Sequence, residues 1–422
     1  MIRRIINPIR SNQQFSNLII YGIGQGFNLI TPLLVVPFIV SRCGVENYGK
    51  ISIGMAISFF LMVFIDYGSD IIGVKEAAVN RENKPQLEHI FVTTFGAKFI
   101  LLLITLFATS LLFYFLPFFN TEKEMFFLGF PILIAQFINP SWFLQGLEDF
   151  TKITILNIAS KLIYLFCIFC FIEQKSDYVF INLFWGAGTL IANGATFLYV
   201  VKANNYRFKN AKSEDIMALL KANFSIFSSQ IFVSLQMYGP IMLIGFFGNN
   251  LMAGQYRIVE QIIVIFKTYI YLFFNFVYPR VCYLIETNLK KGIDFWTTYN
   301  GLNFIFIISS MGIINLFSEQ IVSYFTQTNI VEVAGYLRIG TLIPLLLALS
   351  IPLKQLVLGF NHQRFYIRVT MLMVVLNLIS IIIVIPIYGT KGVFISLIVA
   401  ELATLAVYYQ NIKGKANFKK LF

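Results

Sequence analysis

Long apolar stretches separated by short polar connections recur along the whole chain. Each stretch is about 18 residues or longer, the length that an α-helix needs to cross the hydrocarbon core of a bilayer. Since backbone polar groups in lipid must be satisfied within the chain, the pattern predicts an all-α integral membrane protein. We expect about twelve transmembrane helices, at residues 17–40, 51–72, 91–116, 125–145, 154–173, 179–201, 222–247, 256–278, 295–317, 334–358, 367–387 and 392–410.

The composition agrees with lipid as the outer solvent. Apolar residues make up 58% of the chain and charged residues 12%, whereas soluble domains carry about 25% charged residues. The formal net charge of +12 would suggest nucleic-acid binding in a soluble protein. Here the positive residues lie mostly in alternate short loops, so we expect no nucleic-acid partner.

The distribution of lysine and arginine predicts the orientation. The odd-numbered loops hold few of them: Arg42, Lys50, Lys123, Lys175 and Lys391. The N-terminus, the even-numbered loops and the C-terminus hold most of the others, including Arg3, Arg4, Lys75, Lys202, Arg207, Lys209, Lys290, Arg364, Lys413, Lys415, Lys419 and Lys420. The positive-inside rule then places both termini in the cytoplasm. The N-terminal segment also lacks the short apolar core and cleavage site of a signal peptide.

Chemistry that breaks bonds is not indicated. Cys167 and Cys170 form a CxxC, but they lie in continuous apolar helix and are interpreted as small apolar side chains. The histidines, His89 and His362, both fall in predicted loops, so no metal site has known ligand spacing. No nucleophile–base pair or paired carboxylate is visible. We therefore expect no enzyme, no catalytic residue, no metal and no cofactor.

The chain divides into two similar halves. The basic loop at residues 202–221 separates six predicted spans from six, which predicts an N-terminal lobe at 1–205 and a C-terminal lobe at 206–422. The first span of each half carries matching proline and glycine positions: Pro37 to Gly44 followed by Tyr48-Gly49, and Pro240 to Gly248 followed by Gly254-Gln-Tyr256. This pairing favours a parallel duplication with a site between the halves.

Several motifs resemble one family. They are Pro37-x6-Gly44-Val-Glu-Asn-Tyr48-Gly49, Asp66-Tyr67-Gly68, Trp142-Phe-Leu-Gln145-Gly146-Leu147-Glu148, Gly254-Gln-Tyr256, Tyr278-Pro279-Arg280, Asn377 and Pro386-Ile-Tyr388-Gly389-Thr-Lys-Gly392. In this order, along nearly the whole chain, they resemble polysaccharide-repeat flippases of the Wzx type. These flippases belong to the multidrug/oligosaccharidyl-lipid/polysaccharide (MOP) exporter superfamily.

The resemblance implies a fold and a function. Members of the superfamily have twelve helices in two six-helix lobes around a central cavity. The flippase branch moves an undecaprenyl-pyrophosphate-linked oligosaccharide from the cytoplasmic to the periplasmic leaflet of the bacterial inner membrane. The expected partners are this lipid-linked substrate, membrane lipid, and the polymerase and chain-length regulator of polysaccharide synthesis. Whether the product is O-antigen, capsule or another glycan stays open.

Charges within the predicted spans are the candidate site residues. A charge at the bilayer centre costs about 2.5–3.5 kcal/mol on insertion scales, so such residues are functional candidates. The basic ones, candidates for a cationic cavity, are Lys98, Lys161, Arg257, Lys267, Arg338 and Lys354. The acidic ones, candidates for ion coupling or structural pairs, are Asp66, Asp70, Glu260 and Glu401. The alternative for Arg257, Arg338 and Lys354 is that they reach the headgroups from helix ends.

Lys267 is the leading candidate because it falls near the bilayer midplane. Glu260 lies seven residues earlier on roughly the same helix face. Lys161 and Lys98 lie about 10 Å from the cytoplasmic end of their helices at the helical rise. An anionic pyrophosphate needs cationic donors to replace its hydration shell. The alternative is that these lysines form ion pairs that hold helices in register.

Two carboxylates have open interpretations. Asp66 lies at about the depth of Lys98, so a structural pair between the second and third helices competes with a substrate or proton role. Glu401, near the middle of the last helix, is a candidate for proton or sodium coupling, with a hydrogen-bonded core carboxyl as the alternative. Polar residues within spans are expected mostly to join helices: Asn28, Gln136, Asn139, Asn157, Gln230, Gln236, Gln261 and Asn275.

Two other functions compete with the flippase. A cation-coupled multidrug antiporter of the same fold would often carry an acidic residue in its first helix, but residues 17–40 contain none. A cationic drug would also be ill served by a cavity with many lysines. A membrane scaffold that transports nothing would have little use for midplane charges such as Lys267 and Glu401.

Overall fold

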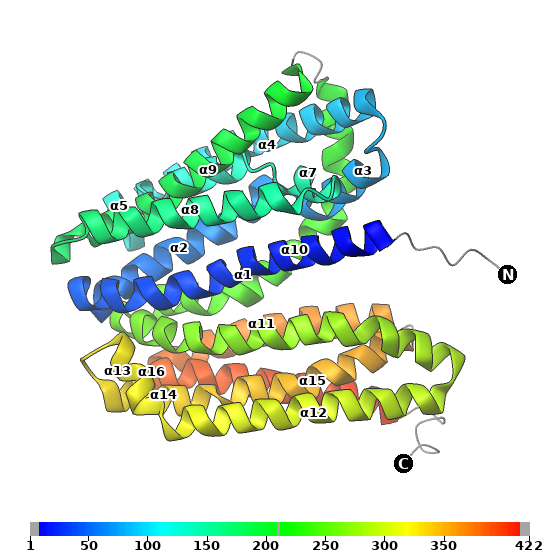
Figure 1. The fold of residues 1–422 in the computed structure, drawn as a ribbon. Coiled ribbons are helices and arrows are strands. Elements are labelled where there is room, and N and C mark those ends of the chain that lie inside the picture. Colours follow the sequence, from blue (N-terminus) through cyan, green and yellow to red (C-terminus); the bar gives the residue numbers. More distant parts are fainter. Residues whose placement is uncertain (1–7, 209–211, 361, 414–422) are drawn as a thin grey trace. The chain divides into compact units, whose positions relative to one another are not determined.

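The computed structural model describes residues 8–208, 212–360 and 362–413, and the regular structure in these ranges is helical (Figure 1). Several basic residues of the predicted topology lie outside them, namely Arg3, Arg4, Lys209, Lys415, Lys419 and Lys420. Within the described residues, ten helices are long and apolar enough to cross a membrane. A bent pair at 117–127 and 130–146 brings the number to eleven if it counts as one span. The prediction of an all-α membrane protein is confirmed.

The elements follow one another along the chain without a strand between them in the described ranges. They are α1 (Pro8–Cys43), α2 (Val45–Asp66), η1 (Ser69–Gly73), α3 (Val74–Val79), α4 (Lys84–Phe115), η2 (Pro117–Glu122), α5 (Lys123–Phe127), α6 (Phe130–Phe137), α7 (Ser141–Gly146), α8 (Phe150–Phe171), η3 (Lys175–Phe180), α9 (Ile181–Asn204), α10 (Ser213–Phe247), α11 (Asn250–Thr287), α12 (Leu289–Leu316), α13 (Ser318–Phe325), α14 (Ile330–Gly340), α15 (Leu342–Gly359) and α16 (Gln363–Lys413).

The last element, α16, contains a break. It has 51 residues, which at the helical rise would extend about 76 Å, more than twice the thickness of a hydrocarbon core. Gly389 is non-helical, with φ 56° and ψ −142°, and separates two helices there. This break lies where the sequence predicts a connection between the spans at 367–387 and 392–410. The count of twelve spans stays a prediction, which the break in α16 favours.

The second and the fourth predicted spans differ from the structure. The second was expected to run to residue 72, but α2 ends at Asp66 because Tyr67 and Gly68 are left-handed, with φ 45° and 80°. The π-helix η1 follows directly. The fourth was expected as one helix at 125–145, but it is divided into α5, α6 and α7, with a bend of 59°. Pro131 and Pro140, which lack a backbone donor, stand at the starts of α6 and α7.

The chain forms two compact units. One comprises Met1–Cys43 and Ile53–Tyr238, and the other comprises Gly44–Ser52 and Gly239–Phe422. In the first unit α8 packs against both α1 and α9, and in the second α15 packs against α11, α12 and α16 (Figure 1). The division into transport lobes at residue 205 stays a prediction.

Two glycines let helix backbones touch within the second unit. A Cβ on Gly49 of α2 would lie 1.8 Å from the carbonyl oxygen of Asn250, the first residue of α11. A Cβ on Gly254 of α11 would lie 2.1 Å from the carbonyl oxygen of Val45, the first residue of α2. The contact is reciprocal, and both glycines belong to the matching positions of the two halves. Only glycine permits an approach this close.

Candidate functional site

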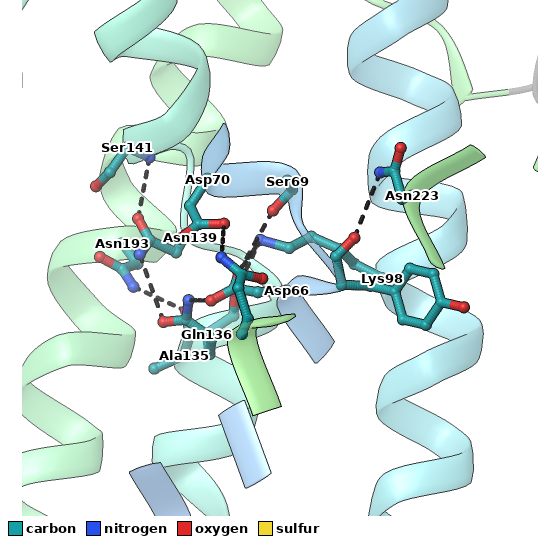
Figure 2. A network of polar contacts seen from close by, with 12 residues as sticks. Asp66, Ser69, Asp70, Lys98, Ala135, Gln136, Asn139, Ser141, Asn193 and Asn223 are labelled. Atoms are coloured by element: carbon teal, nitrogen blue, oxygen red, sulfur yellow. Dashed lines mark hydrogen bonds and ion pairs between the residues drawn. The ribbon is translucent and has the colours of Figure 1, made fainter. Parts of the chain in front are cut away.

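The first unit pairs two of the candidate charges. Lys98 of α4 contacts Asp66 at the end of α2, with 2.9 Å from Nζ to Oδ1, and the two side chains are 2% and 20% exposed (Figure 2). The Gln136 side-chain amide donates a hydrogen bond to Asp66 Oδ2. Lys98 Nζ donates one to the backbone carbonyl of Gln136 at 3.5 Å. The two charges are thus in direct contact, as their matched depth predicts, and the structural role of the pair stays a prediction.

The broken end of α2 explains why the carboxylate needs this partner. A negative charge at a helix C-terminus opposes the helix dipole, and the Lys98 ammonium compensates it. Four residues further, on η1, the exposed Asp70 accepts a hydrogen bond of 2.6 Å from Gln230 Nε2 of α10 (Figure 2). Gln136 and Gln230 thus join helices, as expected for polar residues in spans.

Lys161 of α8 has a different environment. Its Nζ lies 3.3 Å from the centre of the Trp185 ring of α9, and the residue is 9% exposed. Within the described part of the chain no carboxylate contacts it, and no other charge acts on it appreciably. A cation over a tryptophan face is stabilised by the ring quadrupole, so the ring of Trp185 stands where a carboxylate stands beside Lys98.

In the second unit, two further candidates are neutralised by ion pairs. Arg257 Nη1 lies 2.6 Å from Glu260 Oε2, one turn along α11, and the Tyr256 hydroxyl donates to Glu260 Oε1 at 3.2 Å. Arg338 of α14 contacts Glu319 at 2.9 Å, and both side chains are about half exposed, at 46% and 48%. Glu260 therefore pairs with Arg257, although it shares a helix face with Lys267.

The remaining candidates gather around Glu401 of α16. The Ser350 hydroxyl of α15 donates a hydrogen bond to Glu401 Oε1. Ser350 and Lys354 are four residues apart, so they lie on one face of α15. Both Lys267 and Lys354 act electrostatically on Glu401, and all three of these charged residues are partly exposed. Two cations thus face one carboxylate, which leaves an excess positive charge.

Aromatic rings complete this group, and the sequence analysis missed them. Lys354 Nζ lies 4.7 Å, 5.2 Å and 5.9 Å from the ring centres of Tyr366, Phe274 and Tyr271. The signal was present in the sequence: Lys267, Tyr271 and Phe274 have i, i+4 and i+7 spacing on α11, which places them on one face. It was hidden because aromatic residues make up 17% of the chain.

The structure thus sorts the six basic candidates into two classes. Three contact a carboxylate directly: Lys98, Arg257 and Arg338. Three have aromatic neighbours or a shared carboxylate in place of a direct ion pair within the described residues: Lys161, Lys267 and Lys354. The second class is the better suited to an anionic ligand, since a paired ammonium must first lose its partner.

Comparison with known proteins agrees with this fold. The family model described as "Polysaccharide biosynthesis protein" matches residues 15–283. A protein of Escherichia coli (strain K12) named "Putative O-antigen transporter" is 24% identical over 277 residues, which cover 66% of this chain and 67% of that protein.

Two solved structures share the architecture at low identity. An inward-facing multidrug resistance MATE family transporter of the MOP superfamily matches with a TM-score of 0.71 at 14% identity, over 91% of this chain and 94% of that one. The lipid II flippase MurJ, in an inward closed conformation, matches with a TM-score of 0.71 at 15% identity, over 94% of this chain and 87% of that one. The fold is that of multi-pass membrane transporters of the MOP superfamily. The chain belongs to the polysaccharide biosynthesis protein family, which confirms the resemblance found in the sequence.

Proposed function

We propose that the protein is a flippase that moves undecaprenyl-pyrophosphate-linked oligosaccharide repeat units across the bacterial inner membrane for surface polysaccharide synthesis. The observation that carries the proposal is the proximity of Lys267 and Lys354 to Glu401, which also accepts a hydrogen bond from Ser350, one turn before Lys354 on α15. Their excess positive charge within the spans suits a pyrophosphate, which brings its own negative charges into a region where water is scarce.

The same group disfavours the multidrug antiporter as an alternative. An organic cation entering near Lys267 and Lys354 would meet two like charges and one carboxylate. Cation-coupled antiporters of this fold also often carry an acidic residue in the first helix, and residues 17–40 contain no Asp or Glu. The coupling role is instead assigned to Glu401, which competes with the anionic substrate for the positive charges of Lys267 and Lys354.

The other candidate residues take supporting roles in this proposal. Lys161, over Trp185, is a second anion contact in the first unit. The pair of Lys98 with Asp66 holds two helices together, and the pair of Arg257 with Glu260 neutralises two charges within α11. Flipping breaks no covalent bond in the substrate, so the residues only bind and release. Both termini are assigned to the cytoplasm, and a periplasmic polymerase with its chain-length regulator would receive the product.

The test is surface glycan in a strain that lacks the native gene and expresses each variant at matched level. Lys267→Ala should insert normally but abolish or sharply reduce surface glycan, and Lys267→Arg, which keeps the charge with another geometry, should retain part of it. Arg338→Ala is the matched control because it removes a half-exposed cation of the other class. Full glycan with Lys267→Ala at normal protein level would contradict the assignment of the site.

A further inference from the structure

Three aromatic rings from two helices surround the ammonium of Lys354. Tyr271 and Phe274 lie three residues apart on α11, and Tyr366 lies near the start of α16. The three ring centres are 4.7–5.9 Å from Nζ, within the roughly 6 Å at which a cation gains from an aromatic face. Lys354 itself comes from a third helix, α15. We call this group of three rings the aromatic cage.

The cage does not depend on Lys354 for its shape. Phe274 stacks on Tyr278 with 5.1 Å between ring centres and 11° between planes. Tyr366 packs near Tyr408, at 6.4 Å between ring centres. Tyr366, Tyr408 and Leu353 belong to one apolar core. Removal of the lysine side chain should therefore leave the rings in place.

A lysine near a helix end can also reach toward headgroups through a belt of aromatic residues. The contacts of Lys354 are different, because its ammonium lies among rings of two other helices. Ser350, one turn earlier on the same face of α15, bonds to Glu401, so this face is directed at the carboxylate. Glu401 in turn interacts electrostatically with Lys354. The ammonium therefore occupies a site with rings and a nearby negative charge.

Rings around a position with a nearby carboxylate form the arrangement that recognises quaternary ammonium ligands. We propose that Lys354 is an internal occupant of such a site, and that it determines specificity by excluding organic cations from the aromatic cage. With Lys354 present, the group formed with Lys267 and Glu401 has an excess positive charge that repels a cation. Without Lys354, three rings, one carboxylate and one lysine remain, and the group no longer has an excess positive charge.

The distances from the ammonium to the rings indicate the ligand class. The distances between Nζ and the ring centres are those of an alkylammonium group in van der Waals contact with ring faces. A trimethylammonium group is the natural replacement, since it brings the same charge on a wider apolar surface. The inference does not depend on the flippase proposal, because binding alone is measured and no glycan is involved.

The experiment measures binding of benzyltrimethylammonium to the purified full-length protein in detergent by titration calorimetry. Lys354→Ala should bind it saturably, at least about tenfold more tightly than the wild type. Lys354→Arg, which refills the cage with a cation, should bind no better than the wild type. Lys413→Ala is the matched control, because Lys413 lies 6.0 Å from one ring only, that of Tyr409, and it should not gain binding.

Two further results decide the interpretation. Adding Tyr366→Leu to Lys354→Ala removes the nearest ring and should abolish the gain while the protein stays monodisperse. The proposal is overturned if folded Lys354→Ala shows no gain, if Lys413→Ala gains equally, or if the double variant binds as well as Lys354→Ala. A thermal unfolding curve for each variant ensures that the comparison is made between folded proteins.

Discussion

Removing one member of the Lys98–Asp66 pair should strongly destabilise the protein. Asp66→Asn keeps the shape of the side chain but removes its charge, and leaves the ammonium of Lys98, which is 2% exposed, without a counter-charge. Breaking a buried ion pair in this way costs about 3–5 kcal/mol. Native proteins are stable by about 5–15 kcal/mol in total. Asp66→Asn should therefore remove about a fifth or more of the stability of a typical domain.

Replacing Lys98, alone or together with Asp66, separates the contribution of the ion pair to stability from the contribution of each residue. Lys98→Met should destabilise comparably, because the carboxylate then lies without an ion pair at a helix end, where Gln136 and Ser69 are its donors among the described residues. Asp66→Asn combined with Lys98→Met removes both charges and should recover part of the loss. A charge swap, Asp66→Lys with Lys98→Asp, should also recover part of it.

The assay measures the amount of protein that is extracted in detergent. It also measures the midpoint of thermal unfolding, which is followed by size-exclusion chromatography of heated samples. The matched control is the half-exposed pair of Arg338 and Glu319, for which Arg338→Ala should cost less than about 1 kcal/mol. Normal level and an unchanged midpoint in both Asp66→Asn and Lys98→Met would refute the structural role of the pair. Loss of surface glycan at unchanged stability would instead assign the pair to transport.

Two other predictions concern packing and topology. Gly49→Ala should lower the unfolding midpoint, because its Cβ would lie 1.8 Å from the Asn250 carbonyl oxygen. Gly301→Ala is the control: its Cβ would have nothing within 4 Å, so it should leave the midpoint unchanged or raise it slightly. Equal midpoints for the two variants would contradict the close helix contact. Reporter fusions should give a cytoplasmic signal after Lys209 and Lys413 and a periplasmic signal near Asn120 and Gln327, and a periplasmic signal after Lys413 would overturn the twelve-span topology.

Much of the fold could be predicted from the sequence because lipid leaves the backbone few options. Apolar stretches of sufficient length must be helices, so their existence and order follow from hydropathy. The ends of helices depend on local detail that hydropathy does not report. The left-handed Tyr67 and Gly68 end α2 early, and Pro131 and Pro140 divide the fourth span. Prolines within spans usually kink a helix without ending it.

The site was harder to predict than the fold, because partners of a charge come from other helices. Depth along a helix was enough to match Asp66 with Lys98. It could not show that Glu260 pairs with Arg257, since Lys267 shares its helix face equally well. Nor could it show that Lys354 and Lys267 converge on Glu401, which depends on the packing of α11, α15 and α16. Sequence spacing identifies neighbours within a helix, not between helices.

The most direct test of the central claim is flipping by the purified protein in proteoliposomes. Vesicles that contain an undecaprenyl-pyrophosphate-linked oligosaccharide are probed with an external enzyme that modifies the glycan, so the accessible fraction reports movement between leaflets. We predict that the wild type and Arg338→Ala make the substrate pool of the inner leaflet accessible, and that Lys267→Ala, incorporated at equal density, does not. Movement by Lys267→Ala at the wild-type rate, or none by the wild type, would contradict the account.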